Sequence, residues 1–206
     1  MKYTISGLLL FFSLSFLVSL GLFRVFDFST IVKLQEITPG FLTTPFSVFS
    51  ILGSIEFAGV ILLILLLLIP KLNKINVLLS FGIFSILEIA GKTLISQKGP
   101  PIEFLKTNIH LFLPASSIPK DFFSYPSGHS ARTAFISGLL FVIIWNSKLS
   151  KTQKYLFSSL VLAFDLTMFI SRVYLGEHWV TDVIGGTILG FSFAFLSPKV
   201  YFKRSK

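Results

Sequence analysis

Two short polar segments carry nearly all the residues that could do chemistry in this apolar chain. Residues 171–182 read S-R-V-Y-L-G-E-H-W-V-T-D and residues 125–130 read Y-P-S-G-H-S, and together they contain two of the three histidines. His178 and Asp182 are four residues apart, so in a helix that starts near Trp179 they share one face and the carboxylate can hold one imidazole nitrogen. The other nitrogen is then free to attack an electrophile.

An arginine and a second histidine accompany this pair. Arg172 lies six residues before His178, and His129 follows a Ser-Gly turn. An imidazole oriented by a carboxylate, a guanidinium and a second imidazole form a set that can bind a phosphoryl group and cleave it. Each part alone also has a simpler interpretation, because His178 and its acid can be a helix-terminal ion pair and Ser-Gly can be a plain turn.

The spacing S-R-x5-H-x3-D, preceded by P-S-G-H, resembles that of the type 2 phosphatidic acid phosphatase family, whose fold is shared with the vanadium-dependent haloperoxidases. The family has a further signature, K-x6-R-P, upstream of these two. This chain carries it in part, since Lys92 is followed at the right distance by Gly99-Pro100, with glycine where the family has arginine. The resemblance extends from about Lys92 to Asp182.

This resemblance implies a role for each matching residue. His178 would attack phosphorus to give a phosphohistidine, and Asp182 would hold its far ring nitrogen. His129 would protonate the departing lipid oxygen and then help activate water. Lys92, Arg172, Ser127 and the backbone N–H of Gly128 would bind the phosphoryl oxygens, and Lys98, Arg132 or Lys106 would replace the charge missing at Gly99. No metal or other cofactor is implied, since the cations supply the positive charge.

Composition indicates a membrane protein. The 206 residues suit a single domain over 1–206. With a mean hydropathy of +0.83, 53% hydrophobic and only 13% charged residues, the chain is too apolar for a soluble globule. The net charge of +9 does not indicate a nucleic-acid partner, because the basic residues are spread over loops between apolar runs. The chain has no cysteine, which excludes disulfides, thiolate metal sites and a cysteine nucleophile.

The apolar runs predict an all-α integral membrane bundle of six transmembrane helices around a core like that of the phosphatases and haloperoxidases. The six predicted spans are 3–23, 46–69, 75–95, 129–145, 155–172 and 180–196. The first is interpreted as an uncleaved span rather than a signal peptide, because no small-x-small cleavage site ends it. Residues 24–45 are expected to form an extramembrane loop with a short interfacial helix over 29–35.

Ionisable residues inside these spans are expected to face partners rather than lipid. Glu88 and Lys92 are spaced to share a helix face, and we interpret Lys92 as a phosphate-binding lysine that Glu88 orients. Asp165, in the fifth span, is expected to pair with Arg132 or with Arg172.

Three aromatic or imidazole side chains near the motifs receive structural interpretations. His110 lies in the polar, proline-rich loop 96–126, with no motif around it, and is interpreted as an interfacial or packed histidine. Tyr174 and Trp179 are interpreted as part of an interfacial aromatic belt.

The distribution of lysine and arginine predicts the orientation of the chain. Six crossings put both termini on one side. That side holds ten basic residues, namely Lys2, Lys71, Lys74, Lys148, Lys151, Lys154, Lys199, Lys203, Arg204 and Lys206, out of 18. The positive-inside rule therefore predicts cytoplasmic termini. All three motifs would then open at the outer face of a plasma or inner membrane.

Together these observations predict an integral membrane lipid phosphatase that acts at the outer face. The resemblance implies undecaprenyl pyrophosphate, phosphatidate or phosphatidylglycerophosphate as plausible substrates. Transfer to an acceptor other than water uses the same chemistry, so a phosphotransferase stays open. The glycine at position 99 also leaves open a catalytically weak lipid-phosphate-binding protein. A transporter is disfavoured, because no inverted repeat is visible across the two halves.

Overall fold

The structure, a computed structural model, describes residues 2–107, 109 and 123–196. Across these residues the secondary structure is helical, with no strand. His110, Lys120 and the basic residues from Lys199 onwards lie outside the described residues, so the interpretation of His110 stays a prediction.

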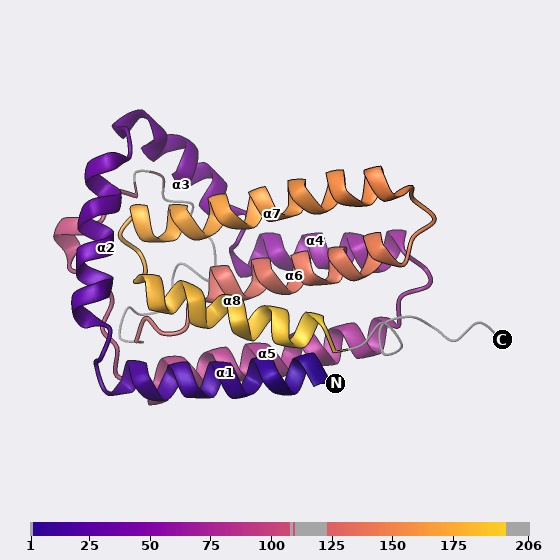
Figure 1. Ribbon diagram of the computed structural model, residues 1–206, viewed down its shortest axis with the longest axis horizontal. Helices are drawn as coiled ribbons and strands as arrows, with labels where there is room; N and C mark the ends of the chain where they lie inside the picture. The colour runs from indigo at the N-terminus through magenta and orange to yellow at the C-terminus, as the bar shows by residue number, and fades with distance from the viewer. Residues whose placement is uncertain (1, 108, 110–122, 197–206) are drawn as a thin grey trace.

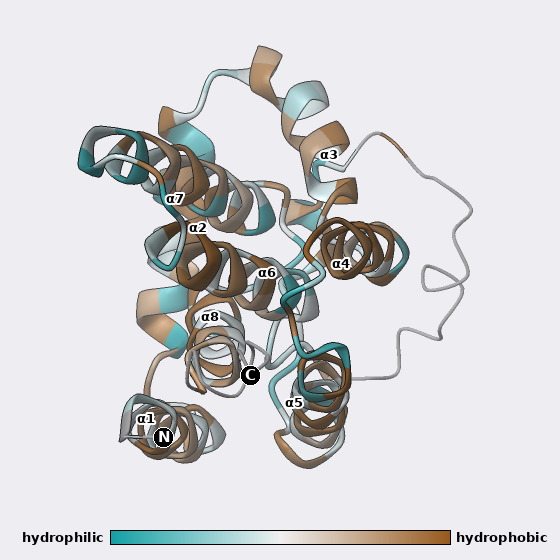
Figure 2. Ribbon diagram, turned by 90° about the vertical axis from the view of Figure 1, so that its right-hand side faces the viewer, coloured by the Kyte–Doolittle hydropathy of each residue, from teal (hydrophilic) through white to brown (hydrophobic). Residues whose placement is uncertain are grey.

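Helix α6 (Gly128–Trp145) is the centre of the bundle. It packs against α8 (Val180–Ala194), α7 (Lys151–Tyr174), α4 (Ile55–Leu68) and α5 (Lys74–Leu94), and α1 (Lys2–Ser19) packs on the outer side of α8 (Figures 1 and 2). Small residues allow α6 and α8 to approach closely. A Cβ added at Gly190 would lie 2.1 Å from the carbonyl oxygen of Ala131, so only glycine permits this crossing.

Helices α5, α6 and α7 are each long and apolar enough to cross a membrane. They lie where the third, fourth and fifth spans were predicted. Large apolar side chains on the bundle surface are exposed, among them Leu79 and Leu160, each 58% exposed. Surface of this kind is suited to hydrocarbon rather than water. The last predicted span corresponds to α8, an apolar helix of 15 residues.

The segment 24–45 is more helical than predicted, and the short helix expected over 29–35 is part of a longer one. Helix α2 (Arg24–Ile37) follows α1 at an angle of 94° and crosses one end of the bundle (Figure 1). The turn between them uses Gly21, whose φ of 71° favours glycine. Helix α2 is held there because Asp27 and Ile31, one turn apart, are both buried.

The predicted second span is broken. Helix α3 (Thr43–Ile51), which follows the short 3-10 turn η1 (Gly40–Leu42), meets α4 at an angle of 55°. The break occurs because Ser54 starts a new helix, its hydroxyl accepting a 3.4 Å hydrogen bond from the amide of Phe57. By length and composition the described helices provide three spans, or up to five if each bent pair is one span, so six crossings stay a prediction.

The two polar segments, 125–130 and 171–182, meet at one end of the bundle. Helices α5 and α7 end there, α6 and α8 begin there, and α2 lies across it (Figure 1). The segment after α5 includes the 3-10 turn η2 (Ile102–Phe104). The three sequence motifs therefore lie at the same end.

Candidate active site

His178 sits in the turn between α7 and α8. Gly176, with a φ of 73°, turns the chain after α7, so that the amides of Glu177 and His178 both donate to the carbonyl of Arg172, at 3.2 and 3.3 Å. A Cβ at Gly176 would lie 2.0 Å from the carbonyl oxygen of Phe104, so a larger residue has no room. The turn fixes His178 directly against the end of α7.

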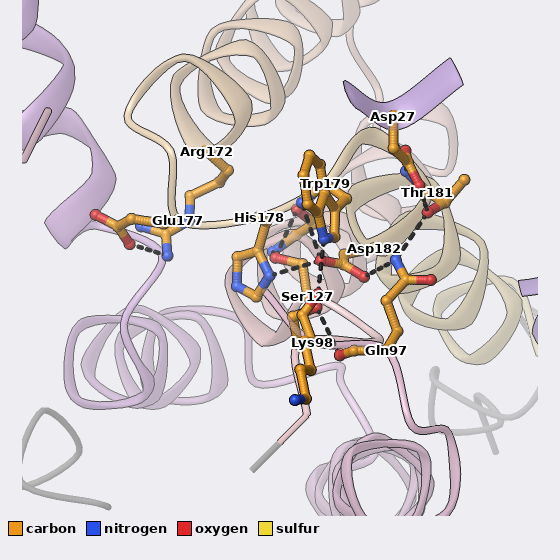
Figure 3. A network of polar contacts seen from close by, with 12 residues as sticks. Asp27, Gln97, Lys98, Ser127, Arg172, Glu177, His178, Trp179, Thr181 and Asp182 are labelled. Carbon is orange, nitrogen blue, oxygen red and sulfur yellow. Dashed lines mark hydrogen bonds and ion pairs between the residues drawn. The ribbon is translucent and has the colours of Figure 1, made fainter. Parts of the chain in front are cut away.

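The predicted contact between His178 and Asp182 is present. His178 Nδ1 lies 3.3 Å from Asp182 Oδ2, which also accepts the Trp179 amide at 2.9 Å (Figure 3). Asp182 is fully buried and His178 is 8% exposed. In the part of the chain that the structure describes, Nε2 of His178 has no hydrogen-bond partner. A carboxylate on Nδ1 places the proton there and leaves the Nε2 lone pair available.

The surroundings of His178 keep it neutral. Burial lowers the pKa of the His178 imidazole well below its ordinary value, and the nearby cations Arg172, Lys92 and Arg132 lower it as well, while Glu177 opposes them. A neutral imidazole is the nucleophilic form. These three cations come from three different helices, α5, α6 and α7, and all act on the one imidazole ring.

The N-terminus of α6 carries the second motif. Ser127 is its N-cap, and its oxygen accepts hydrogen bonds from the amide and the hydroxyl of Ser130, at 3.4 and 3.1 Å. The Ser127 side chain is fully buried, so its oxygen already has a structural task that the sequence did not indicate. The amides of Gly128 and His129, in the first turn, have no acceptor among the described residues. Free amides at a helix start suit an anion.

Position 128 has no room for a side chain. A Cβ there would lie 2.0 Å from Glu88 Oε1 and 2.7 Å from Arg132 Nη1, which fill the space beside the backbone. Glu88 and Arg132 form a buried ion pair at 3.0 Å. The hydrogen-bonded partner of Glu88 is thus Arg132 rather than Lys92, although Glu88 remains within electrostatic range of that lysine. Within the described ranges, the Lys92 ammonium has no hydrogen bond or ion pair.

The break between α3 and α4 gathers three site residues. Ser50 Oγ accepts a hydrogen bond from Arg172 Nη1, and the Gly53 carbonyl accepts one from Arg132 Nε at 3.2 Å. Gly53 also packs on His129, since an added Cβ would lie 3.0 Å from Cδ2 of that ring. This break, which hydropathy could not reveal, holds both arginines and the second histidine.

Arg172 has an acidic partner that the sequence analysis missed. Its Nη2 pairs with Glu177, whose other oxygen accepts a 2.6 Å hydrogen bond from the Thr107 hydroxyl. Burial raises the pKa of the Glu177 carboxyl, but Arg172 and Thr107 lower it by more, so this carboxyl is ionised. Arg172 is buried, and its Nε has no acceptor within the described part of the chain.

The three candidates to replace the cation missing at Gly99 are placed very differently. Arg132 lies in the site, as described. Lys98 is exposed, and its carbonyl accepts the Trp179 indole N–H at 2.7 Å. Lys106 lies over the ring of Tyr174, with its ammonium 4.9 Å from the ring centroid, and donates to the Gln35 carbonyl. Of the three, Arg132 is the one that lowers the pKa of His178.

Two further expectations are corrected. Tyr174 is fully buried, and its hydroxyl pairs with Thr43 at 2.8 Å, so it is not part of an interfacial belt. Asp165 accepts a 2.6 Å hydrogen bond from Ser137 rather than pairing with either arginine, because the arginines are taken by Glu88 and Glu177.

A polar network lies behind the acid that holds His178. Gln97 Nε2 contacts Asp182 Oδ1 at 2.8 Å and Thr181 Oγ1 at 3.0 Å. Thr181 in turn donates its amide and its hydroxyl to the two oxygens of Asp27, at 2.9 and 2.6 Å (Figure 3). Neither Gln97 nor Asp27 was identified from the sequence. Among the residues that the structure covers, no group of three or more His, Cys, Asp or Glu could hold a metal.

The chain is similar to several known proteins. A model of the PAP2 superfamily matches residues 73–206. Phosphatidylglycerophosphatase B of Bacillus subtilis (strain 168) is 41% identical over 78 residues, covering 36% of this chain and 37% of that protein. Undecaprenyl-diphosphatase of Sulfolobus acidocaldarius is 32% identical over 149 residues, covering 70% of this chain and 64% of that protein. The chain thus spans less than two thirds of the length of these curated relatives.

Two solved structures share the fold. The crystal structure of a transmembrane PAP2 type phosphatidylglycerolphosphate phosphatase from Bacillus subtilis superposes with a TM-score of 0.75 at 24% identity, covering 95% of this chain and 94% of that one. That of Aquifex aeolicus LpxE gives a TM-score of 0.64 at 19% identity, covering 83% and 93%.

Proposed function

The chain belongs to the PAP2 superfamily, and we propose that it is an integral membrane phosphatase that hydrolyses a lipid phosphate or pyrophosphate through a phosphohistidine. The observation that carries this proposal is the His178–Asp182 contact, with Nδ1 held at 3.3 Å and Nε2 free of any described partner, beside Arg172 and Lys92. A nucleophile, its orienting acid and two cations are the parts that phosphoryl transfer requires.

In the first step, Nε2 of His178 attacks phosphorus and the bond from phosphorus to the leaving oxygen breaks. His129 gives its proton to that oxygen. Asp182 stabilises the positive charge that the phosphorylated ring acquires. In the second step, His129 takes a proton from water, whose oxygen attacks phosphorus and breaks the P–N bond. Free phosphate leaves, and both histidines return to their starting forms.

Charge on the three equatorial oxygens is stabilised by Lys92, by Arg172 and by the amides of Gly128 and His129 at the start of α6. Two features support these assignments. The Arg172 Nε is a buried donor that lacks an acceptor among the described residues, and a phosphoryl oxygen would supply one. The Lys92 ammonium is likewise without a partner in the described ranges. Ser127 contributes chiefly by capping α6 and so aiming those amides.

Arg132 supplies the charge that Gly99 lacks. It is buried, it lies one helical turn after His129, and its pairing with Glu88 holds it against the start of α6. Lys98 is a weaker candidate because its side chain is exposed. On this proposal the glycine changes the strength and selectivity of phosphate binding rather than the reaction type.

The chain crosses the membrane six times, with its termini in the cytoplasm and the site at the outer face. Because the sequence has no cysteine, single cysteines report this directly. Glu103→Cys, near the site, should react with an impermeant maleimide in intact cells, whereas Lys148→Cys, at the other end, should react only after permeabilisation. The reverse pattern would place the site inside.

Substrates of the undecaprenyl pyrophosphate, phosphatidate or phosphatidylglycerophosphate type are tested with purified protein in detergent. Free phosphate is measured for each lipid, with His178→Ala as the blank. The proposal predicts release well above the blank for at least one lipid. Equal phosphate release by the wild type and His178→Ala would rule out the phosphatase and favour a lipid-phosphate-binding protein. Loss of phosphate from the lipid without release of free phosphate would indicate a phosphotransferase.

A further inference from the structure

We propose that Gln97 is a positioning residue for His178, acting by holding the Asp182 carboxylate in a fixed orientation through a hydrogen-bonded chain that begins at Asp27. This inference rests on the proposed function, because it concerns the nucleophile of that reaction. It assigns a task to two residues that the three motifs do not specify, since Asp27 lies outside them and Gln97 is at one of the unspecified positions between Lys92 and Gly99.

Asp182 needs more than His178 to fix it. Its side chain is fully buried, so both oxygens require partners inside the protein. Oδ2 serves His178 and the Trp179 amide, and Oδ1 accepts from Gln97 Nε2 at 2.8 Å. The Ser124 hydroxyl is a further hydrogen-bond partner of this carboxyl. If the Gln97 donor were lost, the Asp182 carboxylate could rotate and present its oxygens to His178 at a different angle. The orientation of the imidazole ring would then change as well.

Asp27 fixes the direction in which this chain of hydrogen bonds runs. A carboxylate can only accept, so the Thr181 hydroxyl must donate its proton to Asp27 Oδ2, at 2.6 Å. The Thr181 oxygen can then only accept from Gln97, which forces the nitrogen of the glutamine amide, and not its oxygen, to face Thr181 and Asp182. The buried Asp27 carboxylate on α2 thereby determines that the Gln97 amide nitrogen, rather than its oxygen, contacts Asp182 on α8.

The backbone of Gln97 links the same point to the second motif. Its carbonyl accepts the amide of Ser124 at 2.8 Å and the hydroxyl of Ser124 at 3.1 Å, three residues before Ser127. The Ser127 amide in turn donates to the carbonyl of Asp182 at 2.9 Å. Gln97 therefore joins the segment after α5, the start of α6 and the start of α8, and these three places adjoin Lys92, His129 and His178.

The experiment compares Gln97→Met, which removes the donor, with Gln97→Glu, which replaces it by a carboxyl that donates only when protonated. Steady-state kcat and KM are measured from pH 5 to 8 on the lipid that the wild type hydrolyses best. The charged groups around the introduced carboxyl are Asp182 and His178, Asp27 of α2 and Lys92 of α5. The variants at position 35, described next, are measured over the same pH range, so that a pH dependence common to any added carboxyl is separated from one specific to position 97.

Gln35 provides a matched control. Its amide nitrogen also donates two hydrogen bonds, at 2.7 and 2.8 Å, but to the carbonyls of Phe104 and Tyr174. Gln35→Met and Gln35→Glu should therefore change thermal stability without producing a pH-dependent kcat ratio. Asp27→Asn tests the direction of the chain, because an amide at position 27 can donate to Thr181 and let the Gln97 amide flip.

We expect Gln97→Met to lower kcat by about 10–100-fold with KM within about twofold, by analogy with the loss of outer-shell partners of metal-binding histidines. The kcat ratio for Gln97→Glu should rise as pH falls, and Asp27→Asn should also lower kcat. A Gln97→Met enzyme with wild-type kcat, or a flat Gln97→Glu ratio, would overturn the inference while leaving the phosphatase intact. A wild type no more active than His178→Ala would instead remove the proposed function, and this inference with it.

Discussion

Substitution of Gly128 by alanine should destabilise the protein severely although it adds only a methyl group. The added Cβ would lie 2.0 Å from Glu88 Oε1 and 2.7 Å from Arg132 Nη1. Ordinary contact begins at 3.4 Å, so the carboxylate must move by more than 1 Å. The 3.0 Å ion pair between Glu88 and Arg132 cannot survive that movement in its present form.

The size of the effect follows from the burial of the pair. Both side chains are nearly inaccessible, at 10% and 9% exposure, so separating them leaves two charges without adequate partners. Breaking a buried pair costs about 3–5 kcal/mol. For a chain of this length each 1 kcal/mol lowers Tm by roughly 2–4 °C, which predicts a fall of at least about 6 °C.

Thermal unfolding of the purified protein in detergent measures this loss. Gly82→Ala is the control, because it is a helical glycine with nothing within 4 Å of an added Cβ, and it should leave Tm unchanged or slightly raised. In a Glu88→Ala background the effect of Gly128→Ala should shrink markedly, since the clash with the carboxylate and the ion pair that it breaks are both absent. A Gly128→Ala protein as stable as Gly82→Ala, or an equal effect in both backgrounds, would refute the reasoning.

Three further predictions concern activity. Gly53→Ala places a Cβ 3.0 Å from the His129 ring and should lower kcat by roughly 10-fold through displacement of a few tenths of an ångström, whereas Gly82→Ala should not. At Gly99 an added Cβ has room among the described residues, with the Ser124 Cβ at 3.7 Å. Gly99→Arg should raise activity less than about threefold if a substitute cation already works, and a large gain would show that none does. Because the His178 pKa is lowered, the neutral nucleophile persists in acid, and the acid limb of kcat/KM should lie below pH 6.5.

The parts of the site with local spacing could be predicted from the sequence. Asp182 follows His178 by one helical turn, so a helix that begins near Trp179 is sufficient to bring them together, and the structure places them so. The long apolar helices α5, α6 and α7 were predicted for a similar reason, because hydropathy over some twenty residues needs no tertiary information.

The contacts that depend on distant segments could not be predicted. Thr181 and Asp27 are 154 residues apart, and nothing in the spacing of either motif indicates that α2 lies over the start of α8. One signal was present, since Asp27, Ile31 and Leu34 recur at helical spacing within the segment taken for a loop. The partners of Glu88 and Arg172 likewise depend on packing between helices, and composition does not specify them.

The most direct test of the proposed chemistry is to trap the phosphorylated enzyme. The enzyme is mixed with a lipid substrate labelled in its phosphoryl group, and the reaction is stopped rapidly without acid. The wild type should carry a covalent label that is stable in base and lost in acid, located by peptide mapping at His178, and it should appear and decay at rates consistent with turnover. His178→Ala should carry none and release no phosphate. A His178→Ala protein that turns over normally, or a label on another residue, would contradict the account.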